Sequence, residues 1–143
     1  MPFTGTYIRS LDEKLRLSIP GKFREELGDA PLFLGPETDQ SLGLYSRRMF
    51  EQRASKLADV SGSPGHVRNY MRLYYSQAEQ VEPDSQGRIR IPERLTSFAR
   101  LGGEVVLLGV HDHVEVWDKG QWDEFLASHG PEFDRLAGEA FLK

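Results

Sequence analysis

Apolar and polar residues alternate along several short stretches of the chain, with the two-residue period that is typical of a strand with one buried face. The clearest stretch is 16–19, where the apolar residues Leu17 and Ile19 alternate with polar ones. A short β-prone stretch, 7–9, precedes it. We therefore predict that 7–9 and 16–19 form a hairpin.

The same pattern, read together with the turn residues, divides the chain into further elements. Proline suits the first turn of a helix and glycine its end, which places short helices after Pro20 and Pro92. The predicted strands are 7–9, 16–19, 32–34 and 42–45 in the first half and 88–91, 105–108 and 114–117 in the second, and the predicted short helices are 21–27 and 92–99. The first half thus runs strand, strand, helix, strand, strand, and we expect the second half to repeat this order.

Longer helices are predicted at the end of each half and between the halves. Ser46 can cap a helix with apolar residues on one face from 49 to 58, and Asp118 with Gln121 resembles the capping box of a second helix. A break at 61–65 precedes a further amphipathic helix. A helix therefore closes each half, and another links them.

The chain contains part of its own sequence twice. Residues 12–20 recur as 84–92, at an offset of 72 residues, with Asp, Arg, two aliphatic residues and Pro in the same places. The match continues beyond this core, since Leu44-Tyr45 recurs as Val116-Trp117 at the same offset. The chain is a duplicated domain. A unit that repeats a turn-forming Asp, a fixed Arg and a strand is typical of binding by matching surfaces rather than of catalysis.

The size of the repeat makes contact between subunits an expectation. A half of about 70 residues is marginally stable alone, so the halves should share a core with each other or with other subunits. A last predicted helix carries Phe133, Leu136 and Phe141 on one side, and nothing in its own repeat would cover that side. We expect this helix to pack on a neighbouring element or subunit, and the chain to form a homo-oligomer.

The composition argues against secreted and membrane proteins. The chain has no Cys, so it has neither disulfides nor thiolate metal sites, and a reducing cytosol suits it. It starts without a basic segment followed by an apolar run, and no stretch approaches the roughly 20 apolar residues that span a bilayer. We expect a cytoplasmic protein without a membrane partner.

Charge is distributed unevenly along the chain. The net charge of −4 argues against a nucleic-acid binder that ignores sequence. Residues 6–24 nevertheless carry five basic against two acidic residues, whereas 110–143 carries three basic against eight acidic ones. A basic N-terminal face on an acidic body could bind an anion in one orientation. The alternative is a solvated mixture of charges without a ligand.

The residues before each repeated strand favour a tight turn. The carboxylates of Asp12 and Asp84 can accept hydrogen bonds from the backbone N–H groups that follow them. Gly87 can adopt a positive φ at no steric cost, whereas the first copy has Leu15 at this position, which cannot do so cheaply. We therefore assign Asp12, Asp84 and Gly87 to the turns rather than to chemistry.

Residues 12–16 (Asp-x-Lys-x-Arg) and 84–88 (Asp-x-x-Gly-Arg), each followed by an aliphatic-x-Ile-Pro strand end and a short helix, resemble the Asp-x-Lys-Gly-Arg signature of the MraZ family. Two copies at this spacing make the resemblance specific, and it covers nearly the whole chain. Neither copy is complete, because Leu15 replaces Gly in the first and Gln86 stands where Lys is common in the second.

The resemblance implies an α+β fold of two SpoVT/AbrB-like domains, each a swapped-hairpin β-barrel with flanking helices, related by a pseudo-two-fold within the chain. It also implies a ring-shaped homo-oligomer and a bacterial transcriptional regulator, associated with the nucleoid, that binds tandem short repeats of double-stranded DNA upstream of the cell-division and cell-wall operon. The expected divisions are a first domain at 5–50, linking helices at 51–76, a second domain at 77–120 and C-terminal helices at 121–143.

The resemblance assigns DNA contacts to Lys14 and Arg16 in the first motif and to Arg88 in the second, and we infer Arg9 and Arg90 as neighbouring contacts. A two-stranded ribbon can enter the major groove, where Arg pairs with guanine and Lys reaches a base or a phosphate. The alternative is that the Arg of each motif pairs with the Asp of its own turn. Both can hold for different copies.

Two other functions fit parts of the sequence. His111, His113 and Glu115 alternate and would share one strand face, as in the two-His-one-carboxylate site of a metal-dependent enzyme, but no nucleophile or general base is recognisable nearby. An AbrB-like antitoxin is the other alternative, which the duplication disfavours. We therefore predict a protein that is not an enzyme and that has no cofactor, metal or small-molecule substrate.

Overall fold

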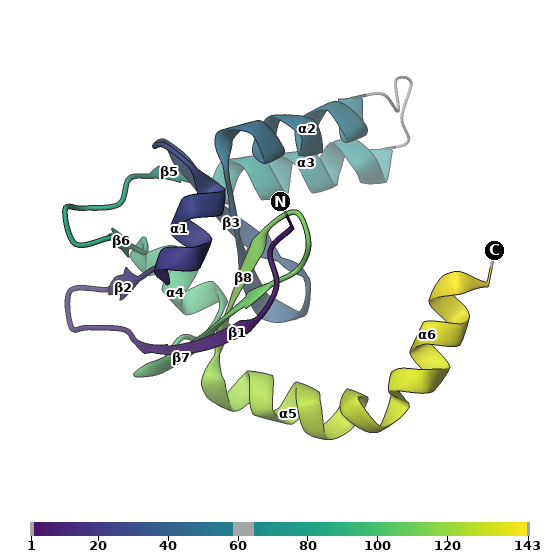
Figure 1. Ribbon diagram of the computed structural model, residues 1–143. Helices are drawn as coiled ribbons and strands as arrows, with labels where there is room; N and C mark the ends of the chain where they lie inside the picture. The colour runs from purple at the N-terminus through teal and green to yellow at the C-terminus, as the bar shows by residue number, and fades with distance from the viewer. Residues whose placement is uncertain (1, 59–64, 143) are drawn as a thin grey trace.

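The computed structural model describes residues 2–58 and 65–142, which form a mixed α+β fold of antiparallel strands and helices (Figure 1). The first half and the linking helix comprise β1 (Thr6–Ser10), β2 (Arg16–Ser18), α1 (Gly21–Leu27), β3 (Leu32–Glu37), the 3-10 turn η1 (Thr38–Gln40), β4 (Ser41–Tyr45), α2 (Arg47–Ala58) and α3 (Gly65–Gln77). The second half comprises β5 (Glu79–Val81), β6 (Arg88–Arg90), α4 (Glu93–Phe98), β7 (Glu104–Gly109), β8 (Val114–Asp118), α5 (Lys119–His129), the 3-10 turn η2 (Gly130–Glu132) and α6 (Phe133–Phe141). The predicted order of elements is confirmed in each half, and residues 61–64 of the predicted break lie outside the described residues.

Six strands form one antiparallel sheet in the order β1-β7-β8-β4-β3-β5, while β2 pairs with β6 in a separate two-stranded ribbon. β1 from the first half pairs with β7 from the second, and β5 from the second half pairs with β3 from the first. The predicted hairpin between 7–9 and 16–19 is therefore wrong, because β1 and β2 each pair with a strand of the other half. This exchange gives the halves a common core, which a unit of about 70 residues would bury poorly alone.

The register of the strands follows the sequence repeat. In the ribbon Leu17 lies opposite Ile89, and in the sheet Gly43 lies opposite Glu115. The two members of each pair are 72 residues apart, which is the offset of the repeat. Equivalent positions of the two halves therefore meet at these two points.

The expected closed barrels are not found among the described strands, since the sheet ends at β1 and β5 and the ribbon is separate from it. Each ribbon strand has only three residues, and Pro20 or Pro92 follows shortly after it. The last backbone hydrogen bonds run from Ile19 N to Gly87 O at 3.0 Å and from Ile91 N to Leu15 O at 2.8 Å. Because proline has no backbone N–H, the ladder cannot continue past it.

The core is formed by apolar residues of both halves. Leu17 and Ile89 are fully buried in the ribbon, and α1 and α4 bury Phe23 and Leu95, which are also 72 residues apart. The helix α1 ends at Gly28, whose φ is +75°, as the sequence predicts. The short helices therefore hold the ribbon against the rest of the core.

The predicted helix caps are present. The Ser46 hydroxyl accepts a hydrogen bond from the Met49 backbone N–H at 3.2 Å, and the Asp118 carboxylate accepts one from the Gln121 N–H at 3.3 Å. The helix α2 packs on β3 through Phe50, which stacks on Phe33 with ring centroids 4.3 Å apart. Figure 1 shows α2 and α3 together on one side of the sheet.

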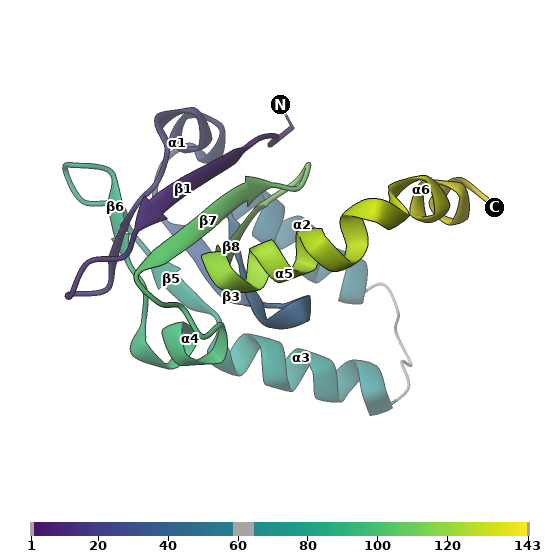
Figure 2. The ribbon, with the colours of Figure 1, turned by 90° about the horizontal axis from the view of Figure 1, so that it is seen from below.

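The last helix, α6, extends away from the sheet (Figures 1 and 2). Phe133 is 73% exposed and Phe141 is 88% exposed. No element in the described part of the chain covers its apolar side, so the expected packing on an element of the same chain is not met there. None of the described helices combines the length and the apolar character needed to span a membrane.

We predict that Leu17→Ala lowers the free energy of unfolding by about 2–5 kcal/mol, because Leu17 is fully buried between the halves and the truncation leaves a cavity. Chemical denaturation monitored by circular dichroism measures the change. The control is Leu73→Ala on α3, where the side chain is 65% exposed and the expected change is below about 0.5 kcal/mol. Equal effects of the two substitutions would contradict a core centred on the ribbon.

Candidate nucleic-acid interface

The first turn is held by the side chain of Asp12. One carboxylate oxygen, Oδ1, accepts hydrogen bonds from the backbone N–H groups of Lys14 and Arg16, both at 2.9 Å. The other, Oδ2, accepts a hydrogen bond from Nε of Arg16 at 2.8 Å. A single carboxylate therefore shapes the turn and orients the guanidinium that follows it.

The second turn repeats this arrangement. Oδ1 of Asp84 accepts hydrogen bonds from the backbone N–H groups of Gln86 at 2.8 Å and Arg88 at 3.0 Å, and Oδ2 accepts one from Nε of Arg88 at 2.9 Å. In each turn the backbone N–H of the arginine is the main cause of a lowered pKa of the aspartate. Both carboxylates are therefore held in the charged form that accepts these bonds.

Both turns use a left-handed backbone at the same position. Gly87 has a φ of +76°, and Leu15 has a φ of +62°. A residue with a Cβ costs about 1–2 kcal/mol in this conformation. The first copy therefore keeps the backbone of the turn without the residue that favours it.

A different side chain packs against each turn, from α1 at the second turn and from α4 at the first. Arg24 on α1 lies where a Cβ on Gly87 would be, with its Nε 2.7 Å from that point, and the same Nε donates to Ile19 O at 3.0 Å. The equivalent of Arg24 on α4 is the smaller Thr96, and it lines a shallow surface cavity together with Leu15. Sequence reasoning placed Arg24 in the basic stretch without linking it to a turn, because only the fold brings α1 to the second turn.

The ribbon presents its arginines on one face. Arg16 lies opposite Arg90, and Ser18 lies opposite Arg88, while the intervening Leu17 and Ile89 point into the core. The turns that lead into β2 and β6 project side by side from the same end of the molecule (Figures 1 and 2). The structure therefore brings Arg16, Arg88 and Arg90 together.

Lys14 and Arg9 lie at the margins of this surface. Lys14 is exposed in the first turn. Arg9 is on β1, at the edge of the sheet, where its Nη1 donates to Ile8 O at 2.9 Å and its guanidinium lies 5.5 Å from the ring centroid of Tyr7. Arg9 is therefore placed by the sheet rather than by the ribbon.

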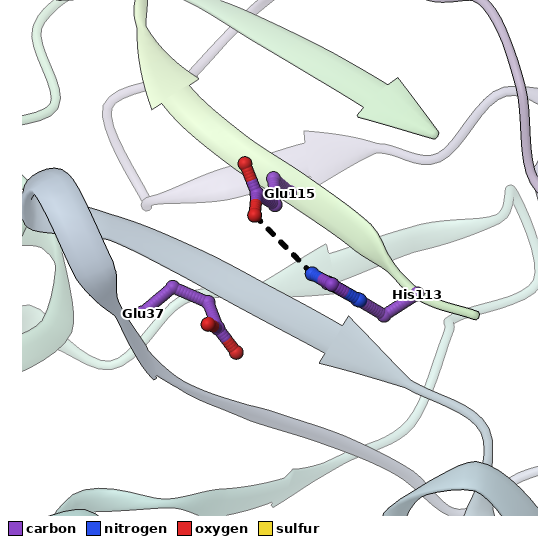
Figure 3. Close-up of side chains that lie close together, drawn as sticks. All are labelled: Glu37, His113 and Glu115. Atoms are coloured by element: carbon purple, nitrogen blue, oxygen red, sulfur yellow. Dashed lines mark hydrogen bonds and ion pairs between the residues drawn. The ribbon is translucent and has the colours of Figure 1, made fainter. Parts of the chain in front are cut away.

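The alternative set of His111, His113 and Glu115 does not form as predicted. His111 has a φ of +67° and forms an isolated bridge with Phe3, away from the other two residues. His113 and Glu115 do lie together, and Glu37 from β3 completes the cluster in place of His111 (Figure 3). The sequence carried no signal for Glu37, which reaches the cluster only because β3, β4 and β8 are adjacent.

Hydrogen bonds outweigh burial at this cluster. Burial alone would lower the pKa of His113, but its hydrogen bonds to Glu115 and Asp112 raise that pKa above its usual value. Burial would raise the pKa of Glu115, but the hydrogen bonds from His113 and Trp117 lower it. Burial and the hydrogen bond to Glu37 raise the pKa of Tyr45 well above its usual value.

The fold and the β2–β6 ribbon define a class of α+β protein in which two repeated Asp-Arg turns hold arginines on one ribbon built from both halves. The sequence model of the family described as "MraZ protein, putative antitoxin-like" matches residues 2–71 and 74–142. The chain belongs to the MraZ family.

Relatives named "Transcriptional regulator MraZ" match over nearly their whole length. The chain is 40% identical over 139 residues to the relative from Corynebacterium urealyticum, which covers 97% of this chain and 96% of the relative. It is 38% identical over 135 residues to that from Alkaliphilus metalliredigens, covering 94% of each. It is 35% identical over 135 residues to that from Moorella thermoacetica, again covering 94% of each.

We predict that Gly87→Ala destabilises the protein more in the wild type than in an Arg24→Ala background. Gly87 has a positive φ, so the substitution costs about 1–2 kcal/mol in backbone strain in either background. In the wild type the new Cβ also displaces Arg24 and breaks its bond to Ile19, for a further 0.5–1.5 kcal/mol or so. Thermal or urea unfolding of the two single variants and the double variant measures the difference, and equal losses in the two backgrounds would argue against the packing of Arg24 on the turn.

Proposed function

We propose that the chain is a sequence-specific, DNA-binding transcriptional regulator that contacts double-stranded DNA through the β2–β6 ribbon and its two turns. The observation that carries the proposal is the convergence of Arg16, Arg88 and Arg90 on the outward face of one ribbon built from both repeats. The names of the relatives support regulation of transcription and favour a protein that is not an enzyme.

The hydrogen bonds of the turns suit this role. In Arg16 and Arg88 the aspartate takes Nε, and the terminal Nη groups make no further hydrogen bond within the described residues. Arginine recognises guanine by donating two hydrogen bonds to O6 and N7, and the paired Nη groups can supply both. Internal pairing with Asp and contact with DNA are therefore compatible, because they use different edges of the guanidinium.

The ribbon is small enough to enter DNA. A two-stranded β-ribbon fits the major groove, which is about 12 Å wide. The fully buried Leu17 and Ile89 hold the ribbon against the core, so that its arginines face outwards from a rigid base. Lys14 in the first turn is positioned to reach a base or a phosphate, Arg90 adds a contact from the ribbon beside Arg16, and Arg9 adds one at the margin.

Affinity comes from repetition of this weak contact. A protomer with few phosphate-neutralising cations releases few counterions, so it binds DNA weakly. A ring-shaped homo-oligomer that places several ribbons on tandem repeats makes each later contact intramolecular, which raises avidity about 100- to 10,000-fold. We propose tandem short repeats in the promoter of the cell-division and cell-wall operon as the target, with the protein in the cytoplasm and at the nucleoid.

The strand exchange between the halves supports the proposal of two SpoVT/AbrB-like swapped-hairpin domains at 5–50 and 77–120. β1 pairs with β7 and β5 with β3, so each half contributes a strand to the other. In this organisation 51–76 links the domains and 121–143 forms the C-terminal helices.

We predict that Arg16→Ala weakens binding to tandem-repeat DNA from upstream of the chain's own gene by at least about tenfold, because each protomer loses a bidentate base contact of about 1–3 kcal/mol. Gel-shift titration measures the affinity, and circular dichroism checks the fold. The matched control is Arg47→Ala, which removes an exposed arginine that also pairs with an acid four residues away, Glu51, but lies on α2. The proposed interface would be wrong if the Arg16 variant bound the DNA as tightly as the wild type, or if the control lost as much affinity.

A second prediction separates positioning from charge. Asp12→Ala makes the protein more basic, so charge alone predicts tighter binding to any DNA. If Asp12 orients Arg16, the variant instead binds the tandem repeats more weakly, on the order of tenfold, while binding to scrambled DNA is unchanged or stronger. Fluorescence anisotropy with both DNAs gives the ratio of the two affinities, and an unchanged ratio would show that the carboxylate does not position the contact.

A further inference from the structure

We propose that Glu37, His113 and Glu115 form a binding site for a divalent transition-metal ion of the Zn²⁺ type, which joins the two halves of the chain. One imidazole nitrogen and two carboxylate oxygens lie within 4.8 Å of one another (Figure 3). Ligand atoms bonded tetrahedrally to such an ion at about 2.0–2.2 Å are about 3.3–3.6 Å apart. Side-chain movements of about 1 Å therefore suffice to close the site.

Gly43 creates the space in which this cluster lies. Gly43 on β4 is opposite Glu115 on β8 and also opposite Gly35 on β3. A Cβ on Gly43 would lie 2.7 Å from Oε1 of Glu37, so the absence of a side chain lets this carboxylate lie across β4 towards Glu115. The ligands thus come from strands that are not neighbours, and the glycine between them permits their contact.

Hydrogen bonds orient all three of the proposed ligands. Tyr45 donates to Oε1 of Glu37 at 2.7 Å, and the Trp117 indole donates to Oε1 of Glu115 at 2.9 Å. Each carboxylate therefore has one oxygen held by an aromatic donor. The second oxygen of Glu115, Oε2, contacts Nε2 of His113 at 3.3 Å, and a bound ion would replace that contact. Such outer hydrogen bonds are typical of metal ligands, since they fix orientation before the ion arrives.

The imidazole is oriented in the same way. Nδ1 of His113 lies 2.8 Å from Oδ1 of Asp112, and this contact orients the ring so that Nε2 faces Glu115, 3.3 Å away. In the ion-free protein a protonated Nε2 donates to Glu115, and a bound ion would take the place of that proton. A histidine that is held by a carboxylate through one nitrogen and binds a metal through the other is common in metalloproteins.

The hydroxyl of Tyr74, a buried polar atom without a partner in the described part of the chain, lies beside Gly35, which is paired with Gly43. The hydroxyl of Tyr74 would be 2.7 Å from a Cβ on Gly35, its residue is only 2% exposed, and it has no hydrogen-bond partner among the described residues. Glu37 lies over Gly43, and burial together with the charge of Glu37 raises the pKa of Tyr74. The buried hydroxyl therefore lies on the Glu37 side of the cluster, where a ligand bound to an ion would give it a partner.

The local charge is compatible with a cation. The carboxylates of Glu37, Asp112 and Glu115 face the cluster, while α2 brings two cations near it. Arg53 lies 5.7 Å from the Tyr45 ring centroid, and Lys56 lines the same small cavity as His113. Three negative charges against two positive ones leave the cluster negative when His113 is neutral.

The cluster is not repeated at the equivalent positions of the other half. The positions 72 residues from Glu37, His113 and Glu115 are occupied by Gly109, Ser41 and Gly43, which supply no carboxylate or imidazole. The cluster is therefore not part of the duplicated Asp-Arg surface. Because Glu37 belongs to the first half and the other ligands to the second, a bound ion would crosslink the halves.

The chemistry of the ligands selects the class of ion. Imidazole favours Zn²⁺ and its neighbours over Mg²⁺ and Ca²⁺, which prefer oxygen alone. Two carboxylates and one imidazole leave positions for water. The proposed role of the ion is to hold the two halves together, because its ligands come from both.

Isothermal titration of the chelator-treated full chain with Zn²⁺ tests the proposal, with Co²⁺ absorption as a spectroscopic report on the ligands. The expected result is one ion per chain, at least about tenfold weaker binding in His113→Gln and Glu37→Gln, and about 10- to 100-fold weaker binding in the positioning variant Asp112→Asn. Zn²⁺ should also raise the melting temperature of the wild type but not that of His113→Gln.

The matched control is His111→Gln, two residues from His113 and outside the cluster, which should bind Zn²⁺ as the wild type does. Absence of Zn²⁺ and Co²⁺ uptake by the wild type would show that the cluster is an ion pair only. Uptake that survives in both His113→Gln and Glu37→Gln would place the ion elsewhere, and either result overturns the proposal. If His113→Gln fails to fold, Glu37→Gln decides alone, and none of these readouts depends on DNA binding.

Discussion

Antiparallel pairing of β2 with β6 is the constraint on which the rest of the structure depends. Each strand has only three residues and would be unstable alone, but the pairing buries Leu17 against Ile89 at the point where the halves meet. Full burial of such side chains contributes about 1.5–3 kcal/mol each. Once these residues face inwards, the two-residue period places Arg16, Arg88 and Arg90 on the outer face. The same pairing brings the two Asp turns to one end of the molecule.

The turns show how one carboxylate can serve both fold and function. Asp12 and Asp84 satisfy backbone donors of the turn with one oxygen and hold Nε of an arginine with the other. The ion pairs are partly exposed, so they contribute little stability in themselves. Their value for the proposed DNA contact is geometric, because they orient the outer edge of each guanidinium before any partner binds.

The repeat is conserved in its backbone more than in its side chains. Leu15 and Gly87 share a left-handed conformation, yet Arg24 packs on the glycine and Thr96 stands at the equivalent place near the leucine. The sheet diverges further, since Glu37 and its neighbours form a polar cluster in one half only. Duplication therefore supplies a common scaffold, and the differences between the halves give each a separate local chemistry.

The sequence by itself determined the order of the elements, the helix caps at Ser46 and Asp118, the end of α1 at Gly28 and the family. These features depend on residues close together in the chain, such as a cap and the N–H three residues later. Only the tertiary structure decided that β1 and β2 pair with the other half and that Glu37 replaces His111 beside His113. The alternation of Leu17 and Ile19 reveals a strand with a buried face, but backbone hydrogen bonds are the same with any partner strand. The partner strand is selected by the total apolar surface that the folded chain buries. That total depends on residues far apart in the sequence, so a local pattern does not reveal it.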